Sequence, residues 1–395
     1  MTDTGAGARS AGKPQGFILL ATAVLPIMAI VSLIPVLPLL LGEFADVASS
    51  EFLVPMALTI PALCVAVFSP VAGWLSDLIG RKQLLVAALV LYAVFGILPW
   101  FLDDLFQIIA ARFALGVVEA VIMTLATVLI GDYFAGERRE RWIAAQIAVG
   151  SIAAIILIAI GGLLGELLGS RGPFLLYLIA LPIALAAAIG LFEPHASKSE
   201  EAVGSQAFPF GIVFPLALIT FGVGIIFYTV TVQLGPILEK SGPVSPAQIG
   251  LIGALCNLAV AIGSFAFHRG RQSAGPRLLT VGLAVAAIGY AGIGFAPNLI
   301  MLAASAILIC FGAGLMLPNM LAWTMRSLPP AVRGRGMGLW TGSFFLAQFL
   351  APLVLAAFSG IAGDLPTALI VYAVAAAIGA LAAGIAARSA GTAAQ

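Results

Sequence analysis

The chain has 395 residues, of which 62% are hydrophobic and only 9% are charged, with a formal net charge of +1. Soluble domains carry about 25% charged residues and under half apolar ones, so this composition excludes a soluble globular protein. It predicts an all-α polytopic membrane protein, with the lipid bilayer as its surroundings and no nucleic acid as a partner.

Twelve apolar runs are each long enough to cross a membrane, because a helix needs about 20 residues to span the hydrocarbon. They lie near residues 17–41, 52–76, 83–102, 105–130, 141–165, 173–192, 209–235, 246–268, 277–296, 299–324, 336–360 and 365–387. The longest polar stretch follows the sixth run. We therefore expect an N-terminal tail (1–16), a six-helix bundle (17–192), a linker (193–208), a second six-helix bundle (209–387) and a C-terminal tail (388–395).

The positions of Lys and Arg orient the chain. Placing the N-terminus in the cytoplasm puts 15 of the 18 basic residues in inner segments and leaves only Arg171 and Lys240 in outer loops. The sequence therefore predicts a multi-pass protein of the plasma (bacterial inner) membrane, with both tails and the linker in the cytoplasm.

The second apolar run ends in the stretch GWLSDLIGRK, which contains Gly73, Asp77, Gly80, Arg81 and Lys82. The two bases are explained as markers of a cytoplasmic loop, and Gly80 as a helix end. Asp77 is not explained in this way, because an acid one turn before a helix C-terminus opposes the helix macrodipole. A neighbouring helix N-terminus or an arginine would offset that penalty.

The fourth run contains Arg112 and Glu119, the only pair of charges well inside a predicted span. Seven residues are two helical turns, so both side chains lie on one face. A charged group in a membrane span is costly and is by default a candidate for function. One interpretation is proton coupling, with Glu119 loading and unloading a proton and Arg112 tuning it. The alternative is a buried ion pair that only holds helices together, although about 10 Å of helix rise separates the two residues.

The two halves of the chain repeat a pattern. The spacing of Gly73, Asp77, Gly80 and Arg81 recurs 190 residues later as Gly263, Phe267, Gly270 and Arg271, without the acid. The loop AGERRERW after the fourth run is likewise answered by AVRGRGMGLW after the tenth. A duplicated six-helix unit is typical of secondary transporters, whose substrate site lies where the repeats meet.

On these residues the chain resembles the major facilitator superfamily. GWLSDLIGRK is similar to the G-x-L-x-D-x-x-G-R-K signature of that family, and RFALGVVEA (112–120) resembles its fourth-span signature. The likeness covers nearly the whole chain and is strongest to the twelve-span drug and small-molecule efflux permeases. One departure concerns the fifth span, where LIAIGG (157–162) keeps the paired glycines of the drug–proton antiporter signature but lacks its Gly-Pro.

The resemblance implies a gate and a cavity. It implies that Asp77, with Asp132 and Arg138 after the fourth span and the start of the eleventh span, forms a cluster that locks the halves together on the cytoplasmic side. It also implies a central cavity, for which sparse polar residues are candidates: Tyr228, Thr231, Gln233, Asn257, Asn319, Trp323 and Gln348. Few polar groups among apolar walls favour an amphipathic substrate. Each of these residues is equally suited to bonding a neighbouring helix.

Enzyme motifs are missing: the chain has no G-x-x-x-x-G-K-[ST] and no H-E-x-x-H, and its three cysteines are too far apart to suggest a metal site. We expect no cofactor, no metal, no enzymatic activity and a monomer. The predicted function is proton-coupled export of small amphipathic molecules. Two alternatives stay open: a proton-coupled or facilitative importer of a small metabolite, and a receptor or assembly partner that does not transport.

Overall fold

The computed structural model describes residues 11–194, 209–270, 275–329 and 332–392, with the exception of a few side chains, among them that of Asp77. The described residues form helices and connecting turns, with no strand among them. The predicted linker at 193–208 therefore lies almost wholly outside the described residues, as do most of the two tails.

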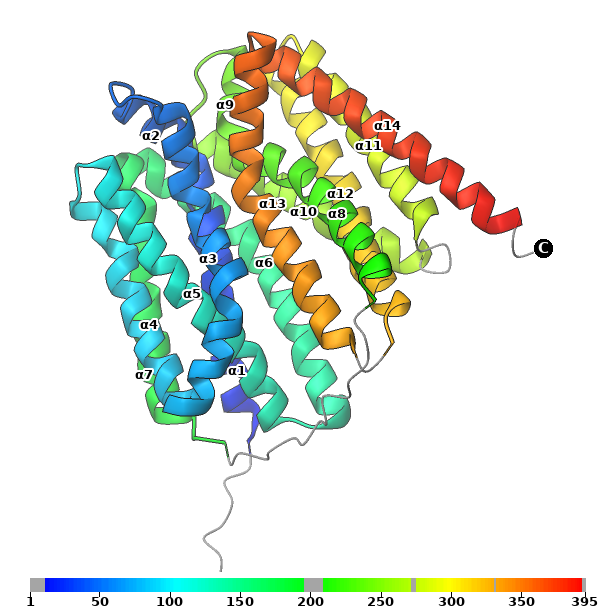
Figure 1. The fold of residues 1–395 in the computed structure, drawn as a ribbon. Coiled ribbons are helices and arrows are strands. Elements are labelled where there is room, and N and C mark those ends of the chain that lie inside the picture. Colours follow the sequence, from blue (N-terminus) through cyan, green and yellow to red (C-terminus); the bar gives the residue numbers. More distant parts are fainter. Residues whose placement is uncertain (1–10, 195–208, 271–274, 330–331, 393–395) are drawn as a thin grey trace, which may run out of the picture.

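The helices of the first half are α1 (Lys13–Val31), η1 (Ile34–Val36), α2 (Leu37–Glu43), α3 (Ser50–Ile79), α4 (Arg81–Ile97), η2 (Leu98–Phe101), α5 (Leu105–Tyr133), α6 (Gly136–Leu168), η3 (Gly169–Ile179) and α7 (Ala180–Gly190). Those of the second half are α8 (Phe210–Val232), α9 (Leu234–Leu238), η4 (Glu239–Ser241), α10 (Pro246–Gly270), α11 (Pro276–Phe295), α12 (Leu299–Ser327), α13 (Arg333–Ala362) and α14 (Leu365–Thr392). The two groups lie side by side (Figure 1).

Eleven segments of the described chain are long and apolar enough to cross a membrane. One of them, Gly136–Gly190, has 55 residues. At 1.5 Å per residue it would be about 80 Å long as one helix, enough for two crossings, and it breaks between α6 and η3. The predicted all-helical polytopic fold is confirmed.

Two predicted spans are less regular than expected. The first run is broken after α1, where Pro35 and Pro38 begin η1 and α2 and cannot donate the backbone hydrogen bonds of a continuous helix. The sixth run begins as the 3₁₀ segment η3, which contains Pro173, and becomes α-helical only at Ala180.

Helix caps repeat between the halves. The side chain of Asp104 accepts a hydrogen bond from the backbone N–H of Gln107 at the start of α5, at 2.9 Å. The side chain of Asn298 does the same for Met301 at the start of α12, at 3.0 Å. Both caps satisfy a backbone donor that has no partner within its helix.

We call the end of the bundle where α1 begins and α14 ends the tail end, and the opposite end the far end. The halves pack together toward the far end, through α6 against α10 and α3 against α13. A side-chain carbon added at Gly250 would lie 3.0 Å from the Cα atom of Gly162, so only glycine permits this approach of α6 and α10. Toward the tail end, a carbon added at Gly73, Gly338 or Gly342 would meet no described atom within 4 Å.

Candidate functional site

Arg112 lies at the centre of the first half, on α5, and is only 1% exposed. Its guanidinium donates hydrogen bonds to the backbone carbonyls of Ala57 (3.0 Å), Leu58 (3.1 Å) and Ala29 (2.7 Å), and to the hydroxyl of Tyr177. The charge is thus held by carbonyls of α1 and α3 and by a phenol from η3. Arg112 joins three separate segments of the bundle.

The local sequence explains why these carbonyls are available. The Ala57 carbonyl would normally accept from the N–H of residue 61, but Pro61 has none. At the end of α1 the N–H of Leu33 turns to Ile30, which leaves the Ala29 carbonyl free. Pro61 and the end of α1 therefore each leave a backbone carbonyl free to accept a hydrogen bond from Arg112.

Gly116 lies between the two charges of α5. A side-chain carbon there would lie 2.5 Å from the Cα atom of Pro61 and 2.8 Å from the Cβ atom of Cys64. The glycine that follows Arg112 by one turn therefore lets α3 approach closely enough for its carbonyls to reach the guanidinium.

Glu119, the second charge of this face, is 2% exposed, and its Oε2 atom is buried without a hydrogen-bond partner. None of the Arg112 hydrogen bonds goes to Glu119, and no ion pair between the two is found in the described structure. The structure therefore does not support the alternative of a static ion pair between Arg112 and Glu119. A carboxylate buried without a donor is costly, which leaves Glu119 open to binding a proton.

The second half repeats the surroundings of Arg112 without the charges. In the first half the rings of Tyr92 and Tyr177 lie 5.3 Å apart, and in the second half those of Tyr290 and Tyr372 lie at the same distance. Tyr92 donates to the Leu25 carbonyl of α1, at 2.6 Å, just as Tyr290 donates to a carbonyl of α8. With the capped starts of α5 and α12 aligned, the positions of Arg112 and Glu119 correspond to alanines, Ala306 and Ala313. The charged pair belongs to one half alone.

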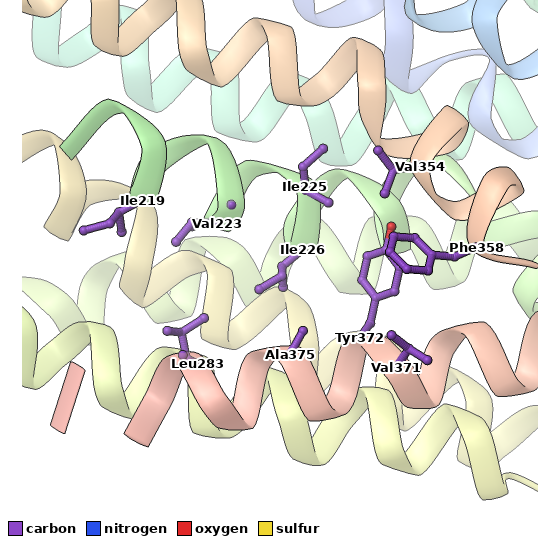
Figure 2. A pocket seen from close by; sticks show the side chains of 12 residues that line it. Ile219, Val223, Ile225, Ile226, Leu283, Val354, Phe358, Val371, Tyr372 and Ala375 are labelled. Carbon is purple, nitrogen blue, oxygen red and sulfur yellow. The ribbon is translucent and has the colours of Figure 1, made fainter. Parts of the chain in front are cut away.

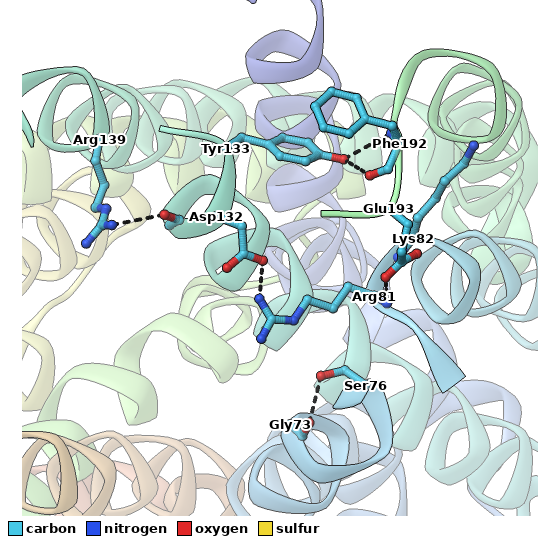
Figure 3. Close-up of polar contacts among 10 residues, drawn as sticks. Gly73, Ser76, Arg81, Lys82, Asp132, Tyr133, Arg139, Phe192 and Glu193 are labelled. Atoms are coloured by element: carbon cyan, nitrogen blue, oxygen red, sulfur yellow. Dashed lines mark hydrogen bonds and ion pairs between the residues drawn. The ribbon is translucent and has the colours of Figure 1, made fainter. Parts of the chain in front are cut away.

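The stretch GWLSDLIGRK forms the last two turns of α3, the junction at Gly80 and the first residues of α4, at the tail end (Figure 3). Gly80 has φ +101°, a backbone conformation that residues other than glycine rarely adopt. The side chain of Arg81 forms an ion pair with Asp132 at the end of α5. The Asp77 side chain lies outside the described part of the chain.

Glu193 is a member of this cluster that sequence reasoning missed. Its carboxylate accepts hydrogen bonds from the backbone N–H groups of Arg81 and of Lys82, the latter at 3.0 Å. It therefore caps the first turn of α4, where an anion is favoured by the helix dipole. The only signal in the sequence was an acid placed directly after an apolar run.

Asp132 and Arg138 are both predicted members of the gating cluster, and the ion pair that Asp132 makes is with Arg81. The guanidinium of Arg138 lies over the ring of Phe134, 5.6 Å from its centroid. Its neighbour Arg139 donates to the carbonyls of Phe134 and Gly131, both at 3.0 Å, and so closes the end of α5.

Replacing Glu193 tests the capping role. We expect Glu193→Ala to lower the stability of the detergent-solubilised protein by about 1 kcal/mol, because two backbone donors of α4 lose their acceptor. Thermal unfolding measures this. Glu137→Ala is the matched control, since Glu137 pairs only with exposed Arg141 one turn away. Equal melting temperatures for the two variants would contradict the assignment.

The predicted cavity residues have different surroundings in the described structure. Thr231 and Asn257 line a small hollow between α6, α8, α10 and α12. Tyr228 packs between the rings of Phe227 and Phe344, and Trp323 is partly buried against the core.

The remaining three predicted cavity residues have distinct surroundings. Asn319 exchanges two hydrogen bonds with the backbone of Gly275, at 2.7 and 2.9 Å, and so fixes the start of α11. Gln348 on α13 is 6% exposed, and its Oε1 atom is buried without a partner. Gln233 lies at the junction of α8 and α9 and lines a cavity at the far end.

A lateral groove of about 340 Å³ lies in the second half, between α8, α11, α13 and α14 (Figure 2). Its walls are almost wholly apolar, with Ile226, Leu283, Val354 and Phe358 among them, and the Tyr372 hydroxyl is its main polar group. All four helices belong to spanning segments, so this groove lies at the level of the membrane.

Comparison with known proteins shows the family to which the chain is similar. The model of the Major Facilitator Superfamily matches residues 18–267 and 216–390. The class H tetracycline resistance protein of Pasteurella multocida is 30% identical over 48% of this chain and 46% of its own length. The class C tetracycline resistance protein of Escherichia coli is 26% identical over 86% of this chain and 88% of its own length. For the first relatives matched, the aligned region is less than half of their length.

The fold also has solved counterparts. A bacterial homologue of the human lysosomal transporter Spinster, in an inward-facing and occupied conformation, superposes with a TM-score of 0.79. The superposition covers 96% of this chain and 98% of that one, at 16% sequence identity. At this identity the likeness concerns the fold alone.

Proposed function

This chain belongs to the major facilitator superfamily, and from that premise we propose that it exports small amphipathic compounds in exchange for protons. It is a multi-pass membrane transporter and not an enzyme. The export direction is supported by the relatives, which are tetracycline and multidrug resistance proteins.

The observation that carries proton exchange is Glu119. It is a buried carboxyl on a spanning helix, and its Oε2 atom has no hydrogen-bond partner. Arg112, on the same face of α5, is fully engaged with carbonyls and a phenol, so it does not neutralise Glu119 by direct contact. A group of this kind binds a proton when its surroundings are dry and releases it when the cavity opens to water.

Alternating access is supported by the packing of the halves. They are in contact toward the far end, whereas Gly73, Gly338 and Gly342 toward the tail end face open space. With both tails in the cytoplasm of a bacterial inner membrane, as the basic residues indicate, this arrangement is accessible from the inside. Rocking of one half against the other would then expose the site to the outside.

The direct test of function is transport into proteoliposomes with an imposed pH gradient and a panel of cationic, neutral and anionic amphiphiles. We expect substrate to accumulate in the compartment that is more acidic, by up to about tenfold per pH unit if one proton is exchanged. Accumulation in the more alkaline compartment would instead identify a proton-coupled importer. No movement of any compound would favour a receptor.

Asp77→Asn tests the gate. We propose that Asp77 stabilises the tail-end contacts of the closed gate together with Arg81 and Asp132, so removing its charge should favour the form that is open at the tail end. Distance distributions between spin labels on the tail-end loops of the two halves measure this population. Substrate binding should change little.

Asp46→Asn, in the loop after α2 at the far end, is the control for this experiment. The gating role of Asp77 is wrong if Asp77→Asn gives the same distance distributions as the wild type and this control.

A further inference from the structure

A second cavity lies at the far end of the molecule, between the two halves. Its volume is about 550 Å³, which is within the range of small-molecule sites. Residues of α3 on one side and of α9, α13 and the start of α14 on the other form its walls. Because both halves line it, any rocking between them changes its shape.

The charged groups of this cavity are all acidic. Glu51 at the start of α3 and Asp364 at the start of α14 line it, and no Lys or Arg is among its described lining residues. Asp364 accepts a hydrogen bond from the backbone N–H of Thr367 at 2.7 Å, and this bond lowers the pKa of Asp364. Both carboxyls are exposed, so water and solutes reach them.

The positive charge of Lys240 also lowers the pKa of Asp364. Its ammonium donates hydrogen bonds to the carbonyls of Ile293 and Gly294, at 2.6 and 2.9 Å. It is thus held at the end of α11 and is not part of the cavity wall. The cavity keeps its acidic character.

Buried polar groups without partners also face this space. Gln233 is 7% exposed and lines the cavity, and its side-chain amide makes no hydrogen bond in the described structure, although its backbone N–H and carbonyl are both bonded. The hydroxyl of Ser359, also in the wall, is buried without a partner. Unpaired polar side chains in buried positions are rare in proteins, so the Gln233 amide, which opens into the cavity, indicates a ligand or solvent that completes it.

The apolar part of the wall includes Phe52 and Leu355, which lie in opposite halves. An amide, an apolar wall and two carboxylates together match the chemistry of a cation with an apolar body. An anionic compound would meet two like charges, and a neutral one would gain no attraction from the two carboxylates.

We propose that this far-end cavity is a binding site for organic cations with an apolar body, through which they leave the protein. The proposal rests on the export function proposed above, since it assigns the far end to the outside. It narrows the substrate class from amphipathic compounds in general to amphipathic cations.

Binding of tetraphenylphosphonium to the purified protein in nanodiscs tests the site without transport or a pH gradient. Its neutral comparison is triphenylphosphine oxide. We expect saturable binding of the cation that the double variant Glu51→Gln/Asp364→Asn weakens by about tenfold. Binding of the neutral compound should be weaker and unchanged in the variant. Asn preserves a helix-capping oxygen at position 364, so the fold should persist, as thermal unfolding would verify.

Glu137→Gln is the matched control, because this exposed acid lies at the tail end and pairs only with Arg141. The proposal is overturned if the wild type binds no tetraphenylphosphonium, or if the double variant binds it as tightly as the wild type. Either result leaves export under a pH gradient intact as a separate question. Conversely, absence of proton-driven transport with cation binding retained would overturn the export function and leave the site.

Discussion

Glu119→Gln should abolish accumulation of substrate against its gradient while leaving downhill exchange intact. Glutamine keeps the size and hydrogen-bonding capacity of the carboxylic acid but cannot release a proton, so the variant resembles a permanently protonated carrier. With a gradient of one pH unit, the wild type should accumulate substrate by about tenfold per exchanged proton, and the variant should reach a ratio of about one.

The measurement compares two modes of the same proteoliposomes. Uptake driven by the pH gradient should be lost, and exchange of labelled for unlabelled substrate at equal pH should continue. Glu137→Gln, an exposed acid in an i,i+4 pair with Arg141, should keep both modes. Loss of both modes in Glu119→Gln would point to a structural role, and retention of both would exclude Glu119 as the proton site.

Arg112→Ala should be the most destabilising single change in the spanning region. It removes the arginine donor from the buried carbonyls of Ala57 and Leu58 and from the Tyr177 hydroxyl, while the Ala29 carbonyl keeps the Tyr177 hydroxyl as a donor. It also opens a cavity where α1, α3 and η3 meet. Each buried polar group that loses its hydrogen-bond partner costs about 1–3 kcal/mol. We expect a large fall in the melting temperature of the detergent-solubilised protein.

Arg112→Lys separates the charge from the hydrogen-bonding geometry. Lysine keeps the positive charge, but its single ammonium cannot reach all the acceptors that Nε, Nη1 and Nη2 of the guanidinium bind, so we expect an intermediate loss of stability. Arg141→Ala, at an exposed position of α6, should melt like the wild type. If Arg112→Lys melts like the wild type as well, the charge alone matters and the fork geometry does not.

The sequence predicted the class of fold because apolar runs of spanning length leave few alternatives. It also predicted that Arg112 and Glu119 lie on one face of a helix, since helical spacing alone decides this, and in the structure both side chains are buried. It could not predict how Arg112 is neutralised. That depends on the carbonyl released by Pro61 and on the end of α1, which become neighbours only when α1, α3 and α5 pack together.

The tail-end cluster was only partly predictable for the same reason. Asp132 and Arg138 are close in sequence, yet Asp132 pairs with Arg81, which comes from another connection of the bundle. Glu193 reaches Arg81 and Lys82 across more than 100 residues of chain. Asn319 resembled a cavity residue in the sequence, whereas in the fold it binds the backbone of Gly275. A polar side chain in an apolar run indicates that it has a hydrogen-bonding partner, but the sequence does not identify that partner.

The two halves differ in the buried charges of their spanning helices. Both halves place a tyrosine pair against carbonyls of their first helix, but only the first half adds a buried base and a buried acid. The proton exchange that we propose needs a site that both states can reach in turn. Glu119 is the candidate, because it is buried, acidic and without a hydrogen-bond partner at Oε2.

Proton movement driven by substrate tests proton-coupled export most directly. Proteoliposomes are prepared without a pH gradient and with a pH-sensitive dye inside, and an outward or inward gradient of an identified substrate is then applied. We predict that protons move opposite to the substrate in the wild type and do not move in Glu119→Gln. Proton movement in the same direction as the substrate, or equal movement in the two proteins, would contradict the account.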